Sequence, residues 1–232
     1  YNELGVKFLP MGNTGNQMGG WFNKEMNTAD DYKGLKMRMP GLGGRTIGKL
    51  GATAVLMGGP DILTSLASGA IDAAEWICPV ADLGLGMHQA AKFYYGPGWH
   101  EPSTLLDLSI DLKEWEGLDA DTQALMMEMA KAFNVDVFSR FQALNGPALG
   151  KLLNEHGVQL KTFPDELLIA LGNAAGEVME ERGSIDSQTK AICNHILSFR
   201  KNIMDWSTKG ESEFARIRNL PFKFPDLSLI HI

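Results

Sequence analysis

Residues 34–40 read Gly-Leu-Lys-Met-Arg-Met-Pro, and residues 41–44 read Gly-Leu-Gly-Gly. The alternation of polar and apolar side chains over 35–39 predicts a strand in which Lys36 and Arg38 share one face. The proline and the glycines then predict a turn into a helix over 44–50. Arg38 would therefore lie at the carboxyl end of a strand and beside a helix N-terminus, where open α/β sheets bind ligands. A guanidinium there could hold a carboxylate through two hydrogen bonds, and a surface ion pair is an equally good interpretation.

The sequence around this stretch alternates short β-like runs with short helical ones. The β-like runs are 5–9, 35–39, 54–57, 72–76 and 104–110, and the helical runs between them are 44–50 and 60–68. Strands that alternate with helices in this way predict an α/β sheet.

After residue 117 the pattern changes to one of longer helices. Asp119 is typical of a helix N-cap, and apolar residues recur at helical spacing from Leu125 to Leu144. Because Pro147 has no amide hydrogen, we expect the helix to kink or stop there, and we expect Gly157 to form a helix C-terminal cap. A strand over 158–162 and helices over 164–182, 186–206 and on to 217 complete the predicted elements.

The composition fits a folded protein that does not bind nucleic acid. Hydrophobic residues make up 44% of the 232 residues, the formal net charge is −7, and no basic stripe is present. Two cysteines, Cys78 and Cys193, allow a disulfide but do not require one. The chain opens at Tyr1 with no initiator Met and no visible signal peptide, so we expect a part of a longer protein. We expect residues 227–232 to be a non-native tail.

The motifs of the common enzyme classes are absent from the sequence. The glycines over 41–48 do not fit a dinucleotide fingerprint, because Thr46 occupies the position of its third glycine. His100 could ligate a metal, but no second histidine lies at ligand spacing, and no zinc or nucleophile-elbow motif occurs. Glu75 ends a mostly apolar strand and therefore needs an arginine, a metal ion or backbone amides as a partner. An NAD-dependent oxidoreductase and a ligand-sensing module remain as alternatives to a binding protein.

Several ordered stretches carry a resemblance to a known family. Three stretches resemble the DctP-type solute receptors of tripartite ATP-independent periplasmic (TRAP) transporters. They are Gly34 to Pro40, Leu50-Gly-Ala-Thr53, and Pro60-Asp-Ile-Leu-Thr-Ser-Leu-Ala-Ser-Gly-Ala-Ile-Asp-Ala-Ala-Glu75. Asn13 to Trp21 and Tyr94 to Glu101 further resemble the branch that binds α-keto acids and related 2-oxo or 2-hydroxy monocarboxylates. The resemblance covers about residues 5–217.

The resemblance implies a two-lobe α/β periplasmic binding protein fold, with strands that cross between the lobes and a long helix that spans both. Residues 1–103 would form the second lobe with the ligand motifs. Residues 104–217 would return to the first lobe with the long helix and the C-terminal helices, and 218–232 would be a tail. The N-terminal part of the first lobe and the signal peptide would be missing. The resemblance also implies a periplasmic location, permease subunits as membrane partners and no catalysis.

The resemblance implies a substrate site for a small organic acid such as pyruvate. Arg38 would hold the substrate carboxylate, and Gln17 would also contact the substrate. Trp76 and Trp99 would form walls of the pocket.

The resemblance also implies a sodium or calcium ion that bridges protein and substrate. Its ligands would be Gln17, Glu75, the backbone carbonyl of Trp76, and Glu101, all of them oxygen donors, which suit a hard cation. One sodium ion would neutralise Arg38, Glu75 and a monocarboxylate together. A divalent ion would fit better if Glu101 also faces the site as a carboxylate, so the choice between the ions stays open.

An apolar stripe marks the predicted C-terminal helix. It comprises Ile192, Ile196, Phe199, Ile203 and Trp206. Some members of the keto-acid branch exchange a terminal helix between protomers, so we expect either a homodimer through this helix or packing of the stripe on the first lobe.

Overall fold

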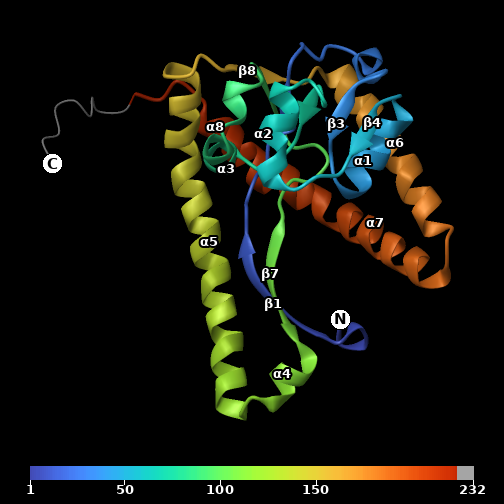
Figure 1. Cartoon of the computed structure of the whole chain (residues 1–232), viewed down its shortest axis with the longest axis vertical. Coiled ribbons are helices and arrows are strands. Elements are labelled where there is room, and N and C mark those ends of the chain that lie inside the picture. The colour runs from blue at the N-terminus through green and yellow to red at the C-terminus, as the bar shows by residue number, and fades with distance from the viewer. Residues whose placement is uncertain (224–232) are drawn as a thin grey trace, which may run out of the picture. The chain divides into compact units, whose positions relative to one another are not determined.

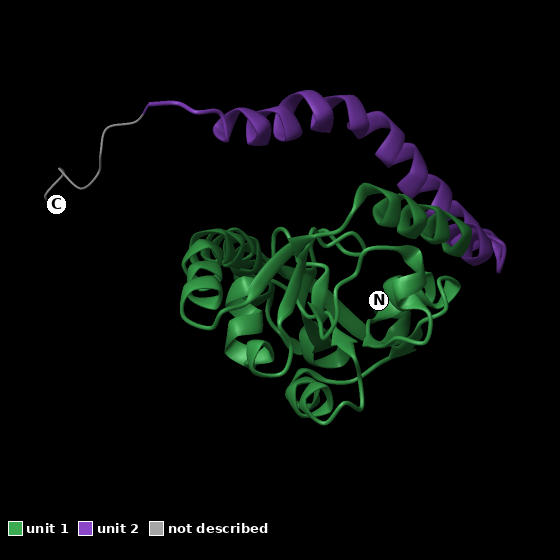
Figure 2. Ribbon diagram, turned by 90° about the horizontal axis from the view of Figure 1, so that it is seen from above, with its two compact units in different colours: residues 1–178 green, residues 179–232 purple. Residues whose placement is uncertain are grey.

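The computed structural model describes residues 1–223. The chain divides into two compact units, residues 1–178 and residues 179–232, drawn in green and purple in Figure 2. The predicted boundary at residue 103 stays a prediction. Of the predicted tail over 218–232, residues 224–232 lie outside the described part. No helix within residues 1–223 is both long enough and apolar enough to cross a bilayer.

A six-stranded sheet forms the centre of the first unit. Its strand order is β4 (Thr53–Val55), β3 (Lys36–Arg38), β5 (Ala73–Ala74), β2 (Gly20–Phe22), β6 (Phe93–Gly96) and β8 (Gln159–Thr162). Only β2 runs antiparallel to its neighbours, so the other five strands share one direction. The carboxyl ends of those five strands and the amino end of β2 therefore meet at one edge of the sheet. The predicted strands over 35–39, 72–76 and 158–162 are confirmed in shorter form, and the strand predicted over 54–57 is found one residue earlier, at 53–55.

Alternate side chains of the sheet enter two separate hydrophobic clusters. Phe22 and Tyr95 lie in one cluster, and their chain neighbours Trp21 and Tyr94 lie in the other. This is the period of two that a strand imposes, so both faces of the sheet are covered. Full burial of one such side chain contributes about 1.5–3 kcal/mol, which makes the sheet a rigid support for the loops at its edge.

Short helices follow the parallel strands. They are α1 (Gly41–Lys49), α2 (Gly59–Ala67) and α3 (Pro79–Leu85), with 3-10 turns η1 (Asn2–Leu4), η2 (Ala29–Tyr32) and η3 (Met87–Gln89). The predicted helices over 44–50 and 60–68 are confirmed as α1 and α2, and α1 begins three residues earlier than predicted. Ile47 of α1 enters the first cluster, and Ile62 of α2 enters the second.

A long two-stranded ladder extends from the sheet region. β1 (Val6–Asn13) pairs antiparallel with β7 (Leu105–Asp111), and α4 (Leu112–Gly117) follows, capped by the side chain of Asp111. β1 and β7 confirm the strands predicted over 5–9 and 104–110. Figure 1 shows β1 and β7 side by side, with α5 (Ala120–Asn154) running along them. A third cluster, centred on Leu9, Trp115 and Ala130, joins α5 to β1.

The helix α5 is continuous over 35 residues, so the predicted interruption at Pro147 is wrong. The Asp119 cap is confirmed, because its side chain accepts a hydrogen bond from the Thr122 amide at 2.9 Å. Tertiary packing outweighs the lost backbone hydrogen bond: Ala148 and Leu152 are buried just after the proline. The cap predicted at Gly157 lies two residues too late, since α5 ends at Asn154 and its C-cap is Glu155. Gly157 does have the expected left-handed conformation, with φ of 65°, and the next amide, that of Val158, donates to the Leu152 carbonyl at 3.0 Å.

The remaining elements are helical. α6 (Asp165–Gly183) matches the predicted helix over 164–182. In the second unit, the side chain of Asp186 accepts a hydrogen bond from the Thr189 amide and starts α7 (Ser187–Ser207). The π-helical turn η4 (Thr208–Ser212) and α8 (Glu213–Arg218) follow. Cys78 and Cys193 are free and buried.

Candidate functional site

The residues singled out in the sequence meet at one edge of the six-stranded sheet. Gln17 lies in the loop that leads into β2, Arg38 ends β3, and Glu75 directly follows β5. Glu101 lies in the loop that follows β6. The common direction of β3, β5 and β6, with β2 reversed, brings these four segments together although they are far apart in the chain.

Arg38 and Glu75 form a buried ion pair. Arg38 Nη1 lies 2.8 Å from Glu75 Oε2 and also donates to the Glu75 backbone carbonyl at 2.6 Å. The two residues are 7% and 1% exposed, so the surface ion pair considered for Arg38 is wrong. The Trp76 ring lies under the Arg38 guanidinium at 5.0 Å and packs against Gly59 of α2. Each charge therefore needs the other, because a lone buried ion is strongly destabilising.

The Gln17 amide is held in one orientation by two threonines. Its Nε2 donates to Thr14 Oγ1 at 3.0 Å and to Thr104 Oγ1 at 2.7 Å. The Thr104 hydroxyl donates its own proton to Glu101 Oε1 at 2.8 Å, so it must accept from Gln17. This arrangement leaves Gln17 Oε1 buried and without a hydrogen-bond partner. A buried carbonyl oxygen of this kind is costly unless a ligand or an ion completes it.

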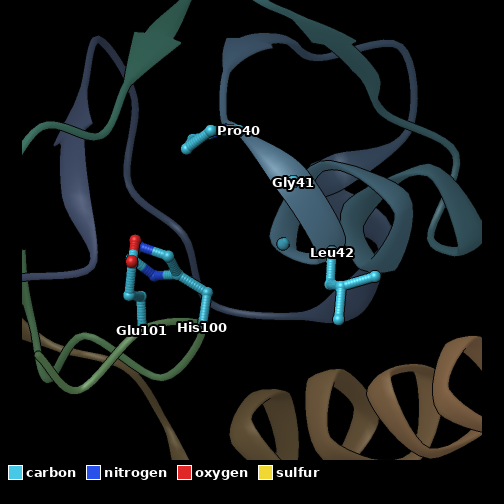
Figure 3. Close-up of a pocket in the computed structure, with 6 residues that line it drawn as sticks. Pro40, Gly41, Leu42, His100 and Glu101 are labelled. Atoms are coloured by element: carbon cyan, nitrogen blue, oxygen red, sulfur yellow. The ribbon is translucent and has the colours of Figure 1, made fainter. Parts of the chain in front are cut away.

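Glu75, His100 and Glu101 form a cluster of donor atoms. One ligand atom from each lies within 4.8 Å of the others. His100 Nε2 is 3.4 Å from Glu75 Oε1, yet neither ring nitrogen makes a hydrogen bond. Figure 3 shows the His100 ring and the Glu101 carboxylate side by side, facing Pro40 and the first residues of α1. Between them is a pocket of about 300 Å³.

Trp99 lies beside this cluster. Its ring packs edge to face with His100 at 5.4 Å between centroids and contacts the first hydrophobic cluster. The pocket is lined by residues 40–43, His100 and Glu101. The wall assigned to Trp99 from the sequence thus stays a prediction.

The donor set fits a hard cation. Gln17 Oε1 is unpartnered and buried, and the Glu75 and Glu101 carboxylates, which cluster with His100, add anionic oxygens. The Trp76 carbonyl follows Glu75 directly in the chain. Oxygen donors with more than one carboxylate are what sodium and calcium prefer.

A second buried carboxylate, that of Asp82, supports the site through hydrogen bonds. Asp82 Oδ1 accepts from the Ile77 amide at 3.1 Å, and Asp82 Oδ2 accepts from Trp21 Nε1 at 2.9 Å and from the Tyr94 hydroxyl at 2.7 Å. The Ile77 N–H belongs to the same planar peptide as the Trp76 carbonyl, so Asp82 fixes the plane of that carbonyl. Burial raises the pKa of the Asp82 carboxyl to about 6.

Sequence reasoning missed Thr14, Asp82 and Thr104. Each acts through a hydrogen bond to a residue distant in the chain or in another element, for which a single sequence gives no local signal. His100 was considered as a ligand and set aside because no second histidine lay nearby in the chain. Its neighbours in the structure are instead the two carboxylates of Glu75 and Glu101, and its position directly before Glu101 in a glycine-rich loop was the available signal.

Comparison with known proteins places the chain among bacterial solute-binding proteins. Residues 1–184 match the family described as bacterial extracellular solute-binding protein, family 7 (DctP). A curated relative from Nostoc sp. (strain PCC 7120), named monocarboxylate 2-oxoacid-binding periplasmic protein, is 39% identical over 214 residues. The match covers 92% of this chain and 58% of the relative, so the chain spans somewhat more than half of that protein's length.

Two solved structures are similar to the chain in both sequence and fold. A TRAP periplasmic solute-binding protein from Pseudoalteromonas atlantica T6c, with bound sodium and pyruvate, is 35% identical, with a TM-score of 0.88. That match covers 96% of this chain and 67% of the other. One from Colwellia psychrerythraea, with bound calcium and pyruvate, is 36% identical, also with a TM-score of 0.88, over 93% of this chain and 66% of the other. The α/β fold class that the sequence predicted is confirmed.

Proposed function

Because the chain belongs to family 7 of the bacterial extracellular solute-binding proteins, we propose that it captures a small 2-oxo or 2-hydroxy monocarboxylate, such as pyruvate, for a TRAP transporter. Capture would take place in the periplasm, and the permease subunits of the transporter would receive the ligand. The relative from Nostoc and the two pyruvate-bound structures support this choice of ligand class.

The buried edge of the sheet carries the proposal. Loops and strand ends at this edge carry the Arg38–Glu75 ion pair and the unpartnered Gln17 Oε1, so the site offers a fixed positive charge and an oxygen donor that has no partner within the protein. Arg38 holds the carboxylate of the ligand, and Gln17 contacts the ligand from the loop before β2. Trp76 supports the guanidinium from below. Trp99 limits the pocket beside His100.

A cation completes the charge balance of this site. Gln17, Glu75, Glu101 and the Trp76 carbonyl would hold it, and it would supply positive charge that stabilises the bound carboxylate. Arg38, Glu75 and a monocarboxylate sum to −1, which one sodium ion neutralises. If Glu101 is a direct ligand, the sum is −2, and calcium fits better. A neutral buried combination is the stable one.

The test is pyruvate binding by calorimetry after exhaustive chelation in sodium-free buffer, with each ion then restored singly. We expect affinity to vanish without a cation and to return with sodium or with calcium. If pyruvate affinity returns with calcium alone, Glu101 is a direct ligand of the ion. If it returns with sodium alone, Glu101 lies outside the coordination shell. Full pyruvate affinity without any cation would refute the bridging role.

An enzyme is the alternative of a different class, and we propose that the chain has no catalytic activity. A dehydrogenase would need a cofactor loop, and the 41–48 segment lacks the third glycine of the fingerprint. A thermal-shift comparison separates the two functions, since a ligand that binds only the folded state raises its melting temperature. We expect a shift with pyruvate and none with NAD. The opposite result would favour the oxidoreductase.

A further inference from the structure

His100 has no role in the function proposed above, yet its side chain is only 2% exposed and lies against Glu75. Both of its ring nitrogens are buried without a hydrogen-bond partner. We infer that His100 adds a nitrogen donor to Glu75 and Glu101, so that the site also takes a borderline divalent metal such as Co²⁺ or Zn²⁺. This inference rests on the cation site of the proposed function and extends the range of ions that it accepts.

The spacing of the donor atoms fits a shared metal ion. His100 Nε2 and Glu75 Oε1 are 3.4 Å apart, and one atom from each of His100, Glu75 and Glu101 falls within 4.8 Å of the others. Two ligands at about 2.0–2.1 Å from one metal ion lie about 2.8–3.4 Å apart for octahedral to tetrahedral angles. The His100–Glu75 separation is thus what two neighbouring ligands of one ion would show.

The unpartnered nitrogens give the second, independent reason. A neutral imidazole has one N–H donor and one acceptor nitrogen, and burying either without a partner is costly. A metal ion at the cluster would take the lone pair of Nε2. The nearby carboxylates would supply the negative charge that a divalent ion requires. Arg38, Glu75, Glu101, a divalent ion and a monocarboxylate sum to zero, so the complete site would be neutral.

A nitrogen ligand changes which metals the site prefers. Calcium and sodium favour oxygen donors alone, whereas imidazole favours the first-row transition metals, whose affinities rise along the Irving–Williams order. The Gln17, Glu75 and Glu101 oxygens would serve either kind of ion. His100 would therefore set the ratio of transition-metal affinity to calcium affinity rather than calcium affinity itself.

The test measures Co²⁺ and Ca²⁺ binding separately in metal-free buffer, with Co²⁺ followed by its visible absorption and by calorimetry. The variants are His100→Phe, which removes the nitrogen, and His100→Gln, which replaces it with an amide in case the first variant does not fold. His88→Phe is the matched control, because His88 is a partly buried histidine that stacks on His156 away from the cluster. It reports any cobalt bound adventitiously by that pair.

We expect the His100 variants to lose Co²⁺ affinity by at least about tenfold while Ca²⁺ affinity changes by less than about threefold. His88→Phe should match the unsubstituted protein for both ions. Unchanged Co²⁺ affinity in the His100 variants, or an equal loss for Co²⁺ and Ca²⁺, would overturn the inference. Pyruvate binding with Ca²⁺ or Na⁺ is measured on the same unsubstituted sample. A lack of pyruvate binding would count against the proposed function, and the ratio of Co²⁺ to Ca²⁺ affinity could still be measured.

Discussion

At the scale of single residues, Arg38 and Glu75 stabilise each other at a depth where neither charge would be stable alone. Glu75 accepts from Arg38 through its side chain and its backbone carbonyl, and its amide donates to the Arg38 carbonyl at 3.0 Å. The two strands at whose ends they lie are hydrogen-bonded neighbours, so the sheet fixes the two backbones relative to each other. A ligand carboxylate entering this site would meet an arginine whose position is already fixed, which lowers the entropic cost of binding.

Replacing Arg38 by alanine should therefore weaken pyruvate binding by roughly 30-fold or more, since losing one partner of a buried charge pair costs about 2–5 kcal/mol. Arg45→Ala is the matched control, because Arg45 is exposed on α1. Calorimetry should show no change for Arg45→Ala. A loss below about threefold for Arg38→Ala would remove Arg38 from the ligand site.

Gly98 permits the loop after β6 to approach Gln17. A Cβ atom on Gly98 would lie 2.8 Å from the Gln17 backbone oxygen, closer than real contacts allow. We expect Gly98→Ala to lower the unfolding free energy by about 1–3 kcal/mol and to weaken cation binding, because Gln17 must move. Gly48→Ala is the control: a Cβ there meets nothing within 4 Å, and alanine should stabilise α1 by about 0.5–1 kcal/mol. Urea unfolding should give a lower free energy of unfolding for Gly98→Ala and a higher one for Gly48→Ala than for the unsubstituted protein.

Asp82 gives stability a pH dependence of known sign. Burial raises the pKa of its carboxyl from 3.8 to about 6, so the folded state holds the proton more tightly than the unfolded state. Its contribution is therefore fully present below about pH 4 and is lost as the pH rises through about 6, a change on the order of 3 kcal/mol. Urea unfolding should show that the free energy of unfolding of the unsubstituted protein falls, relative to that of Asp82→Asn, as the pH rises from about 4 to about 6. A difference independent of pH would contradict the assignment.

The sequence identified part of the candidate site for physical reasons. Arg38 and Glu75 end strands, and strand alternation and position are local features that a sequence carries. The orientation of the Gln17 amide is not local, since it depends on Thr104, 87 residues away. His100 was set aside because sequence motifs for metal sites place a second histidine nearby in the chain. Here the sheet instead brings Glu75 close to His100 from the end of another strand.

At the scale of elements, the longer and more regular segments were predicted best. The alternation in 35–39 and the cap at Asp119 are local signals, and the structure has the strand and the helix start where they predict them. β2 and β6 were missed because both are short and apolar throughout, being buried on both faces. Such strands lack the alternation that identifies a half-buried strand.

The proline inside α5 shows where local propensity yields to packing. Pro147 cannot donate to the carbonyl four residues earlier, yet α5 continues, and the side chain of Asn145 accepts a hydrogen bond from the Val80 amide of α3 at 3.2 Å. Pro147→Ala restores the missing donor and should raise the unfolding free energy by about 2 kcal/mol, after allowance for the looser unfolded chain. Gly150→Ala, in open space one turn on, should give less, about 1 kcal/mol. Chemical denaturation of the two variants tests the order, and a destabilised Pro147→Ala would show that the helix is adapted to the proline.

At the scale of the whole molecule, α7 exposes a row of large apolar side chains. On α7 the side chains of Ile192, Ile196, Phe199 and Trp206 are 49–67% exposed, and they lie on one face of the helix. A contiguous apolar face of this kind marks an association surface. A second copy of the chain can cover it through a symmetric contact, in which the same stripe meets itself. Packing against another part of the same protein is the competing arrangement.

We predict that a homodimer forms through α7 and that Phe199→Glu converts it to a monomer. A carboxylate at the centre of the stripe would have to be buried without a partner in the dimer, and such burial costs several kcal/mol. Asn194→Glu is the matched control, because Asn194 is exposed on the opposite face of the same helix and gains the same charge. Sedimentation at micromolar concentration should give a dimer for the unsubstituted protein and for Asn194→Glu, and a monomer for Phe199→Glu. An unsubstituted protein that sediments as a monomer would favour packing of the stripe within one protomer, and Phe199→Glu would then lower thermal stability instead of changing the mass.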